Sequence, residues 1–360
     1  MYPLIDIIRA AAALLVLVFH VITVGQWSSF PESPWTTPFR YGWVGVDLFL
    51  VISGFVITLS AARARLKSPE AFRWSFMQRR LWRVVPLYVL TCTVFIFLIR
   101  PEFLTHSVAY IAGEVLSHAL FLQNLSPLTH GVINGVTWSL ALEMQFYIAL
   151  ILSIGWLLRL GALRALVLVV SVALAWRYGS TFFLIPGEAA VPLQVIYTTQ
   201  LPGTLDAFGM GIALALLVFN GKGFLADRLK AGWSNCAMWL GLAIVLLALA
   251  GSLLMERGGT YWTLPGMVIF WRTLLATGFG ACLAASITCP LSGAGILRPI
   301  RYLGQISYGI YLWHMPVVLA LITQPDLRGS RLLVCTLIGT ISLAALSWHL
   351  MEKHWVRGQK

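Results

Sequence analysis

Charged side chains are scarce in this chain, since only 11% of its 360 residues are Asp, Glu, Lys or Arg, whereas 59% are hydrophobic. This deficit excludes a soluble domain of such length. The five cysteines form no CxxC pair and have no ordered histidine partners, which argues against a zinc site or a disulfide framework. An internal repeat, a low-complexity tract and a long hydrophilic stretch are also missing. The sequence therefore predicts one membrane domain over residues 1–360 and no metal.

Long apolar segments fill the chain instead. They cover 4–25, 42–62, 84–99, 107–122, 137–158, 162–178, 203–219, 233–255, 262–287, 302–323 and 331–351. Most approach the roughly 20 residues with which a helix crosses about 30 Å of hydrocarbon. They lack the alternating polarity of a membrane β-barrel. The first is too long and too poor in small residues near its end for a cleaved signal peptide, so it is kept as a span. An all-α polytopic membrane protein is predicted.

The positive charges in the loops decide whether segment 107–122 crosses the membrane. This segment is short and holds Glu114 and His118. If it does not cross, seventeen of the 25 Lys and Arg lie inside, six lie outside, and Arg9 and Arg272 lie within the bilayer. This count favours about ten spans with both termini cytoplasmic. The stretch 101–136 then becomes an outer loop with a re-entrant or interfacial helix.

The net charge of +12 comes from short loops rather than from a basic domain. Nucleic acid is therefore not expected as a partner, whereas membrane lipid is. The sequence leaves the oligomeric state open.

The first span contains two polar residues, Arg9 and His20, within LIDIIRAAAALLVLVFHVITVG. Ionisable groups at membrane depth are costly and therefore mark functional sites. Eleven residues of α-helix turn about 20° past three full turns and rise about 16 Å. Both side chains therefore lie on one face at two depths, as in the wall of a polar path.

Other spans carry polar residues at comparable depths. In the second span, Asp47 and Gly54 share a face beside Ser53. A Gly/Ser packing interface is the alternative there. In the fifth strong segment, Ser139, Glu143 and Tyr147 follow one stripe at i, i+4 and i+8. A carboxylate such as Glu143 can orient a histidine base, or it can form a structural salt bridge with Arg272.

The later spans add Arg272 near the bilayer centre and the face Ser307, Tyr311 and His314. An equal alternative for His314 is a structural histidine that is buried in the core with its ring nitrogens hydrogen-bonded. Trp138 fits an interfacial anchor or a pocket wall, and Asp206 fits a helix cap.

The loop 63–83 is rich in arginine, and its sequence MQRRLWRVVP places Arg79, Arg80 and Arg83 just before Pro86. Arginines one turn apart at a helix start can hold phosphates by forked hydrogen bonds. Binding of lipid headgroups and anchoring of the topology are the alternatives. The excess of charge favours a polyanionic ligand.

Five motifs in this order resemble acyltransferase family 3, a family of bacterial integral-membrane O-acyltransferases. They are Arg9…His20, Gly45-Val46-Asp47-Leu48-Phe49…Ser53-Gly54-Phe55, Arg79-Arg80…Arg83…Pro86…Tyr88, Trp138-Ser139…Glu143…Tyr147 and Ser307-Tyr308…Tyr311…His314…Pro316. Ala10, Leu50 and His354 depart from the family pattern, and the last leaves the role of Glu352 in doubt. The resemblance suggests a stand-alone form without a fused hydrolase-like domain.

The resemblance implies transfer of an acyl group, commonly acetyl, from cytoplasmic acyl-CoA to a hydroxyl of a glycan or glycolipid at the outer face. His20 is then the general base, with Glu143, Asp47 and Arg9 as further catalytic candidates. The donor-binding candidates are Arg79, Arg80, Arg83, Arg9, Ser53 and Gly54. The acceptor-side candidates are Trp138, Ser139, Tyr147, Arg272, Tyr308, Tyr311 and His314.

Two other readings stay open. A covalent acyl-histidine or acyl-serine intermediate is possible within the enzyme class. A transporter or flippase also uses intramembrane charges, although the inverted repeats typical of such proteins are not visible in the sequence.

Overall fold

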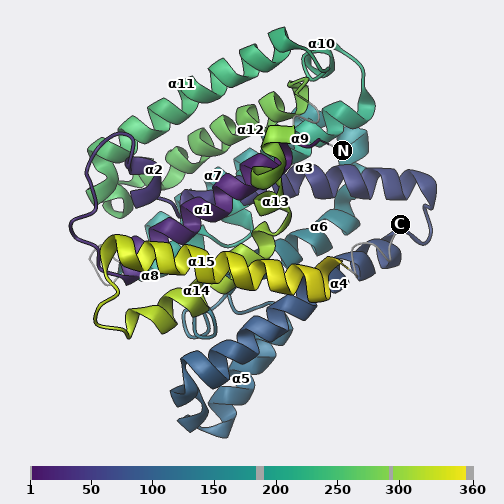
Figure 1. The fold of residues 1–360 in the computed structure, drawn as a ribbon. Coiled ribbons are helices and arrows are strands. Elements are labelled where there is room, and N and C mark those ends of the chain that lie inside the picture. The colour runs from purple at the N-terminus through teal and green to yellow at the C-terminus, as the bar shows by residue number, and fades with distance from the viewer. Residues whose placement is uncertain (1, 184–189, 292–294, 354–360) are drawn as a thin grey trace. The chain divides into compact units, whose positions relative to one another are not determined.

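The computed structural model describes residues 2–183, 190–291 and 295–353, and every regular element within these ranges is a helix (Figure 1). Nine helices there are long and apolar enough to cross a membrane. Their bounds are Ile5–Val24, Val44–Lys67, Phe72–Ile99, Gly135–Leu160, Ala162–Thr181, Pro202–Asn220, Trp233–Thr263, Met267–Thr288 and Gly329–Glu352. A tenth candidate is the pair Gly295–Gln305 and Ser307–Ile322, which is bent by 58°. The chain is therefore an all-α polytopic membrane protein with about ten spans, as the apolar segments predict.

The weak segment 107–122 does not form a span. It folds into α5 (Val108–Ala119), a helix of 12 residues that is too short to cross the hydrocarbon core. Ser107 caps its first turn by accepting a hydrogen bond from the Tyr110 backbone N–H. Figure 1 shows α5 beside the C-terminal part of α4, and Tyr88 Oη of α4 (Phe72–Val94) donates to the His118 carbonyl at 3.1 Å.

The polar residues that weaken this segment as a span lie on the buried face of α5. Glu114 is 3% exposed and His118 is 4% exposed. Burial raises the pKa of Glu114 and lowers the pKa of His118, because it disfavours the charged form of each group. The opposite face of α5 exposes leucine and valine side chains. α5 is thus an amphipathic helix within the loop between two spans.

The chain divides into two compact units that alternate along the sequence. Unit one comprises Met1–Ile8, Asp47–Phe72 and Leu142–Leu297, and unit two comprises Arg9–Val46, Arg73–Ala141 and Arg298–Lys360. Four of the described helices pass from one unit to the other, namely α1 (Ile5–Val24), α3 (Val44–Lys67), α6 (Trp138–Leu160) and, by its first residue alone, α4.

Each unit packs mainly through pairs of neighbouring helices (Figure 1). In unit one, α11 (Trp233–Arg257) lies along α12 (Arg272–Thr288), and α9 (Leu205–Asn220) packs on both α7 (Ala162–Phe183) and α12. In unit two, α14 (Ser307–Ile322) lies along α15 (Gly329–Ser347). The remaining elements are short: α2 (Thr37–Arg40), α8 (Ala190–Thr198), α10 (Phe224–Asp227) and α13 (Arg298–Gln305).

The predicted loop 63–83 is wrong, since most of it is helical. α3 continues to Lys67, and α4 already begins at Phe72. Pro69 lies in the short break between the two helices. From Phe72 onward, Arg, Met, Gln and Leu favour helix, and no glycine or proline occurs before Pro86, so nothing there stops α4. Pro86 lies inside α4, and the three arginines therefore lie on a helix body rather than at a helix start. His354, Arg357 and Lys360 lie outside the described residues.

Gly54 is a point of close approach between α3 and α9 in unit one. A Cβ on Gly54 would lie 2.2 Å from the Phe208 carbonyl oxygen, and one on Gly211 would lie 2.1 Å from the Val51 carbonyl oxygen. Both contacts are to backbone, so neither can be relieved by a side-chain rotation. The structure thus favours the packing interpretation of Gly54.

We expect Gly54→Ala to lower the thermal stability of the protein in detergent, because overpacking costs about 1–3 kcal/mol. Gly241→Ala is the matched control, since Gly241 lies in α11 and a Cβ there meets no atom within 4 Å. That change should leave the melting temperature unchanged or raise it slightly. Equal melting temperatures for Gly54→Ala and wild type would contradict the contact.

Candidate active site

His20 and His314 meet in unit two, although 294 residues separate them. His20 Nδ1 lies 2.9 Å from the Val16 carbonyl oxygen of its own helix and 3.2 Å from His314 Nε2. His314 Nδ1 lies 3.3 Å from the Ile310 carbonyl oxygen. His314 is 1% exposed, whereas His20 is half-buried.

These contacts assign the protons of the two rings. A carbonyl oxygen only accepts, so each of the two ring-to-carbonyl contacts is a hydrogen bond when Nδ1 of that histidine carries the hydrogen. His314 Nε2 is then an acceptor that shares the proton on His20 Nδ1. His20 Nε2 carries a lone pair, and it has no hydrogen-bond partner among the described residues. An imidazole in this state is suited to remove a proton from a hydroxyl group.

The loop before α6 holds the His314 helix in place. Pro316 lies inside α14 and has no N–H, so the Leu312 carbonyl loses its usual helical partner. Asn134 Nδ2 donates to that carbonyl instead, at 3.3 Å. Tyr311 Oη donates to the Val136 carbonyl at 2.9 Å and lies 2.7 Å from Ser139 Oγ. Ser139 and Tyr311 are thus bonded to each other and to the backbone.

Arg9 and the arginines of α4 lie in the same unit as the histidine pair. Arg79, Arg80 and Arg83 are half-buried. Arg80 also covers the Phe76 ring at 5.2 Å from its centroid. The charges of Arg9 and Arg83 both act on the buried carboxyl group of Glu352 at the end of the last span. Glu352, at the end of the last span, therefore lies near Arg9 of the first span and Arg83 of the third. The sequence did not predict this proximity.

Glu143 has its partners in unit one. Its Oε1 accepts hydrogen bonds from Ser53 Oγ at 2.7 Å and from Tyr147 Oη at 2.6 Å. The Tyr147 contact is the i, i+4 relation that the stripe on the fifth segment predicts. Two donors on one oxygen hold the carboxylate in a fixed position. In the same unit, the ion pair of Arg272 is with Asp47, so the salt-bridge alternative for Glu143 gains no support.

Two buried ion pairs lie elsewhere in unit one. Arg272 Nη2 is 3.8 Å from Asp47 Oδ2, and Arg177 Nη2 is 2.5 Å from Asp206 Oδ2. Thr273 Oγ1 donates to the same Asp206 oxygen at 2.6 Å. All four ionic side chains are buried, and Arg177 is fully inaccessible to solvent. The predicted role of Asp206 as a helix cap is wrong, since the N-cap of α9 is Thr204. Asp206 instead pairs with Arg177, and its Oδ1 accepts from the Ala207 backbone N–H.

The sequence does not mark Arg177 as a site residue, and the loop charges assign it to the six cations on the outer side. The structure places it in α7, which runs to Phe183, with its side chain buried in the interior of unit one. The signal was available, since Asp206 is a carboxylate inside an apolar segment and a buried carboxylate requires a cationic partner.

Two further acceptor-side candidates have structural partners in unit two. Tyr308 Oη donates to the Val84 carbonyl of α4 at 2.6 Å. The Trp138 ring stacks on His130, with 6.0 Å between centroids and 25° between planes. Among the described residues, no group of three or more His, Cys, Asp or Glu is placed to hold a metal ion.

Comparisons with known proteins identify the family of the chain. Residues 2–352 match the family model described as an acyltransferase domain. The chain is 27% identical to the peptidoglycan O-acetyltransferase OatA of Listeria monocytogenes, over 97% of this chain and 55% of that protein. It is 28% identical to the putative peptidoglycan O-acetyltransferase YrhL of Bacillus subtilis, over 98% of this chain and 54% of that protein. The chain thus spans about half the length of these two relatives.

A third relative is matched over more of its length. The putative membrane-bound transacylase BcsY of Komagataeibacter xylinus is 27% identical, over 97% of this chain and 81% of that protein. No solved structure matches the chain. The family model covers the histidine pair, the arginines of α4 and both ion pairs. The chain therefore belongs to the acyltransferase family.

Proposed function

We propose that this chain is a membrane O-acyltransferase that moves an acetyl group from cytoplasmic acetyl-CoA to a hydroxyl of a glycan acceptor at the outer face. The contact between His20 and His314 carries this proposal, because it leaves a basic nitrogen at one end of a polar helix face. The other end of that face holds Arg9, which acts together with Arg83 on Glu352. Family membership and the named relatives support the acyl chemistry.

The proposed donor site lies around Arg79, Arg80, Arg83 and Arg9. Guanidinium groups bind phosphate through forked, charge-assisted hydrogen bonds, and the nucleotide part of CoA carries several phosphates. The helix α1 then spans about 16 Å from Arg9 to His20, which the extended pantetheine arm bridges. The thioester in this proposal lies beside His20.

The proposed reaction begins when His20 Nε2 removes the proton of the acceptor hydroxyl. The oxygen attacks the thioester carbonyl, and a C–O bond forms as the C–S bond breaks. The proton on His20 then passes to the CoA sulfur, so the products are an ester and free CoA. His314 holds the His20 ring through Nδ1 and accepts part of the charge that develops on it.

In unit one, Glu143 and Asp47 remain catalytic candidates in this proposal, and the donor-side and acceptor-side candidates around them take positioning roles. Ser53 and Tyr147 position the Glu143 carboxylate as an acid–base group, and Arg272 balances the charge of Asp47. Ser139 and Tyr311 act as positioning residues, since their hydroxyls are engaged with the protein.

The direct test is purified protein in lipid nanodiscs, given labelled acetyl-CoA and a soluble glycan. We expect release of CoA and ester-linked label on the glycan, with empty nanodiscs as the control. No binding of acetyl-CoA and no transfer to any tested glycan would overturn the proposal. In that outcome the transporter reading would account better for the buried charges.

The arginines of α4 give a second measurement. We expect Arg83→Ala to raise the KM for acetyl-CoA about tenfold with kcat retained, because a hydrogen bond to a charged group contributes about 1.5–3 kcal/mol. The matched control is Arg73→Ala, since Arg73 is an exposed arginine of the same helix. An unchanged KM in Arg83→Ala would point instead to an arginine that only anchors the topology.

A further inference from the structure

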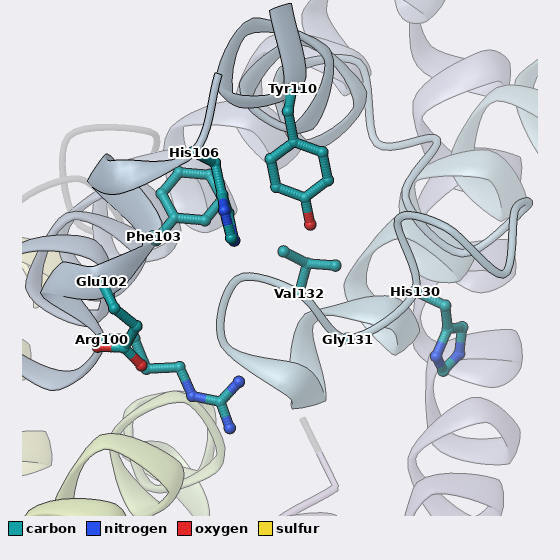
Figure 2. A pocket seen from close by; sticks show the side chains of 8 residues that line it. All are labelled: Arg100, Glu102, Phe103, His106, Tyr110, His130, Gly131 and Val132. Carbon is teal, nitrogen blue, oxygen red and sulfur yellow. The ribbon is translucent and has the colours of Figure 1, made fainter. Parts of the chain in front are cut away.

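The segment between α4 and α6 forms a polar pocket of about 300 Å³ in unit two (Figure 2). Figure 2 shows the side chains of Arg100, His106 and Tyr110 around it, with the Gly131–Val132 turn between them and His130. Glu102 also lines the pocket. The catalytic residues proposed above are not among its lining.

Short elements place these side chains. A single π-helical turn, Phe95–Ile99, ends at Arg100, and a 3-10 turn, Pro101–Thr105, follows it directly. His106 then precedes the Ser107 cap of α5, whose first turn carries Tyr110. The backbone is therefore fixed by three consecutive helical elements rather than by an open loop.

The base of the pocket is apolar and packed. Phe95, Phe103 and Ile133 form a buried cluster against which Val132 and Leu319 pack. The His106 ring meets Tyr110 edge-on, with 4.8 Å between centroids. Aromatic edges and a packed base keep the polar groups above them in place without a ligand, which lowers the entropic cost of binding.

The chemistry of the lining selects among ligands. Arg100 donates, Glu102 accepts, and the histidines and Tyr110 can do both. In the described part of the chain, no carboxylate lies within ion-pairing distance of Arg100, so its donors are available. Glu102 would repel a phosphate group, which argues against a lipid headgroup or a nucleotide. A ligand with many hydroxyls offers both donors and acceptors and can use aromatic rings as apolar walls.

The volume of the pocket narrows the class of ligand further. Ligand sites of drug-sized molecules occupy about 300–1,000 Å³, so this pocket is at the lower end and suits one or two sugar rings. It is too small to take a lipid chain in addition to them.

The pocket is connected to the helix of His314. His130 stacks on Trp138, the first residue of α6. Two residues beyond Val132, Asn134 donates to the Leu312 carbonyl, and Val136 accepts from Tyr311. The same stretch of chain thus lines the pocket and packs on α14. A ligand held in the pocket is attached to the unit that carries both histidines.

We propose that this pocket binds a sugar unit of the glycan acceptor and so sets which glycan the protein modifies. The assignment rests on the proposed function for its role, and on the lining groups for its chemistry. Arg100, Glu102 and Tyr110 hold the hydroxyls of the sugar, while His130 extends the site toward Trp138.

The test uses the full chain in nanodiscs and the variant Arg100→Gln combined with Tyr110→Phe. Both residues are exposed, so the fold should persist, and an unchanged melting temperature verifies this. We expect the KM for chitotetraose or maltotetraose as acceptor to rise at least about tenfold. The KM for acetyl-CoA and the slow hydrolysis of acetyl-CoA without acceptor should not change. Arg257→Gln is the control, since Arg257 is an exposed arginine at the end of another span.

Direct binding separates this proposal from the proposed function. Saturation-transfer NMR reports whether either oligosaccharide binds, independently of any turnover. Binding by wild type that is lost in the double variant supports the pocket, even if acetyl-CoA is never consumed. An unchanged acceptor KM in the variant, or the absence of oligosaccharide binding by wild type, would overturn it.

Discussion

His20→Ala is expected to reduce acyl transfer by about 10²–10⁴-fold, the usual contribution of a general base. His20 Nε2 is the basic nitrogen of the pair, because Nδ1 is engaged by Val16 and His314. Affinity for acetyl-CoA should stay close to that of wild type, since the donor phosphates are assigned to the arginines of α4 and to Arg9, which lies about 16 Å from His20 along α1. Single-turnover transfer and equilibrium binding of acetyl-CoA, measured on the same preparation, separate the two effects.

The control for this experiment is His314→Gln. Glutamine keeps an acceptor for the proton on His20 Nδ1, so the base should remain oriented and the loss of rate should be smaller than in His20→Ala. His314→Ala removes that acceptor and should lose more activity than His314→Gln. Turnover that persists in His20→Ala would exclude His20 as the base. Equal activity of both His314 variants and wild type would limit His314 to packing.

Arg177→Met is expected to destabilise the protein by about 3–5 kcal/mol, because it leaves Asp206 buried without its cation. Thermal unfolding in detergent measures this change. Adding Asp206→Leu should recover much of the loss, since removing both members of a buried pair is often nearly neutral. Thr273 contacts both side chains and should tolerate replacement better in the double variant than in wild type.

An exposed ion pair provides the control for Arg177→Met. Arg257 and Glu256 lie 2.9 Å apart, with more than half of each side chain exposed. Such pairs contribute little, so Arg257→Met should leave the melting temperature unchanged. If Arg177→Met were equally harmless, water or another cation would have to reach Asp206, and the buried pair would not support unit one.

Hydropathy was sufficient to predict the spans, because a membrane-crossing helix must satisfy its backbone internally and present apolar side chains to lipid. The charges of Glu114 and His118 and the loop arginines also identified the segment that does not cross. Hydropathy did not predict that α4 begins at Phe72. Outside the hydrocarbon core, helix is no longer tied to apolarity, and the arginine-rich stretch from Phe72 carries a helix without the hydrophobic signal.

Contacts between polar residues of different helices were harder to predict from the sequence than the spans. Helical periodicity placed Glu143 and Tyr147 on one stripe, and this pair is in contact. It gave no information on pairs between helices, such as His20 with His314 or Ser53 with Glu143, because those depend on how the helices pack. Arg177 shows the same limit, since its partner Asp206 lies on a different helix.

The vacancy that Pro316 leaves in α14 is filled by the amide of Asn134, from the loop that lines the sugar pocket. Asn134 of the loop and Pro316 of α14 therefore depend on each other. A chimera that takes the segment 100–137 from a relative with another acceptor would need the corresponding partner at position 316 as well. If position 316 were not proline, its backbone N–H would already bond the Leu312 carbonyl, and Asn134 would have no acceptor there. If the loop lacked Asn134, the Leu312 carbonyl would be left without a donor. Exchange of acceptor preference in this family should be sought with both segments moved together.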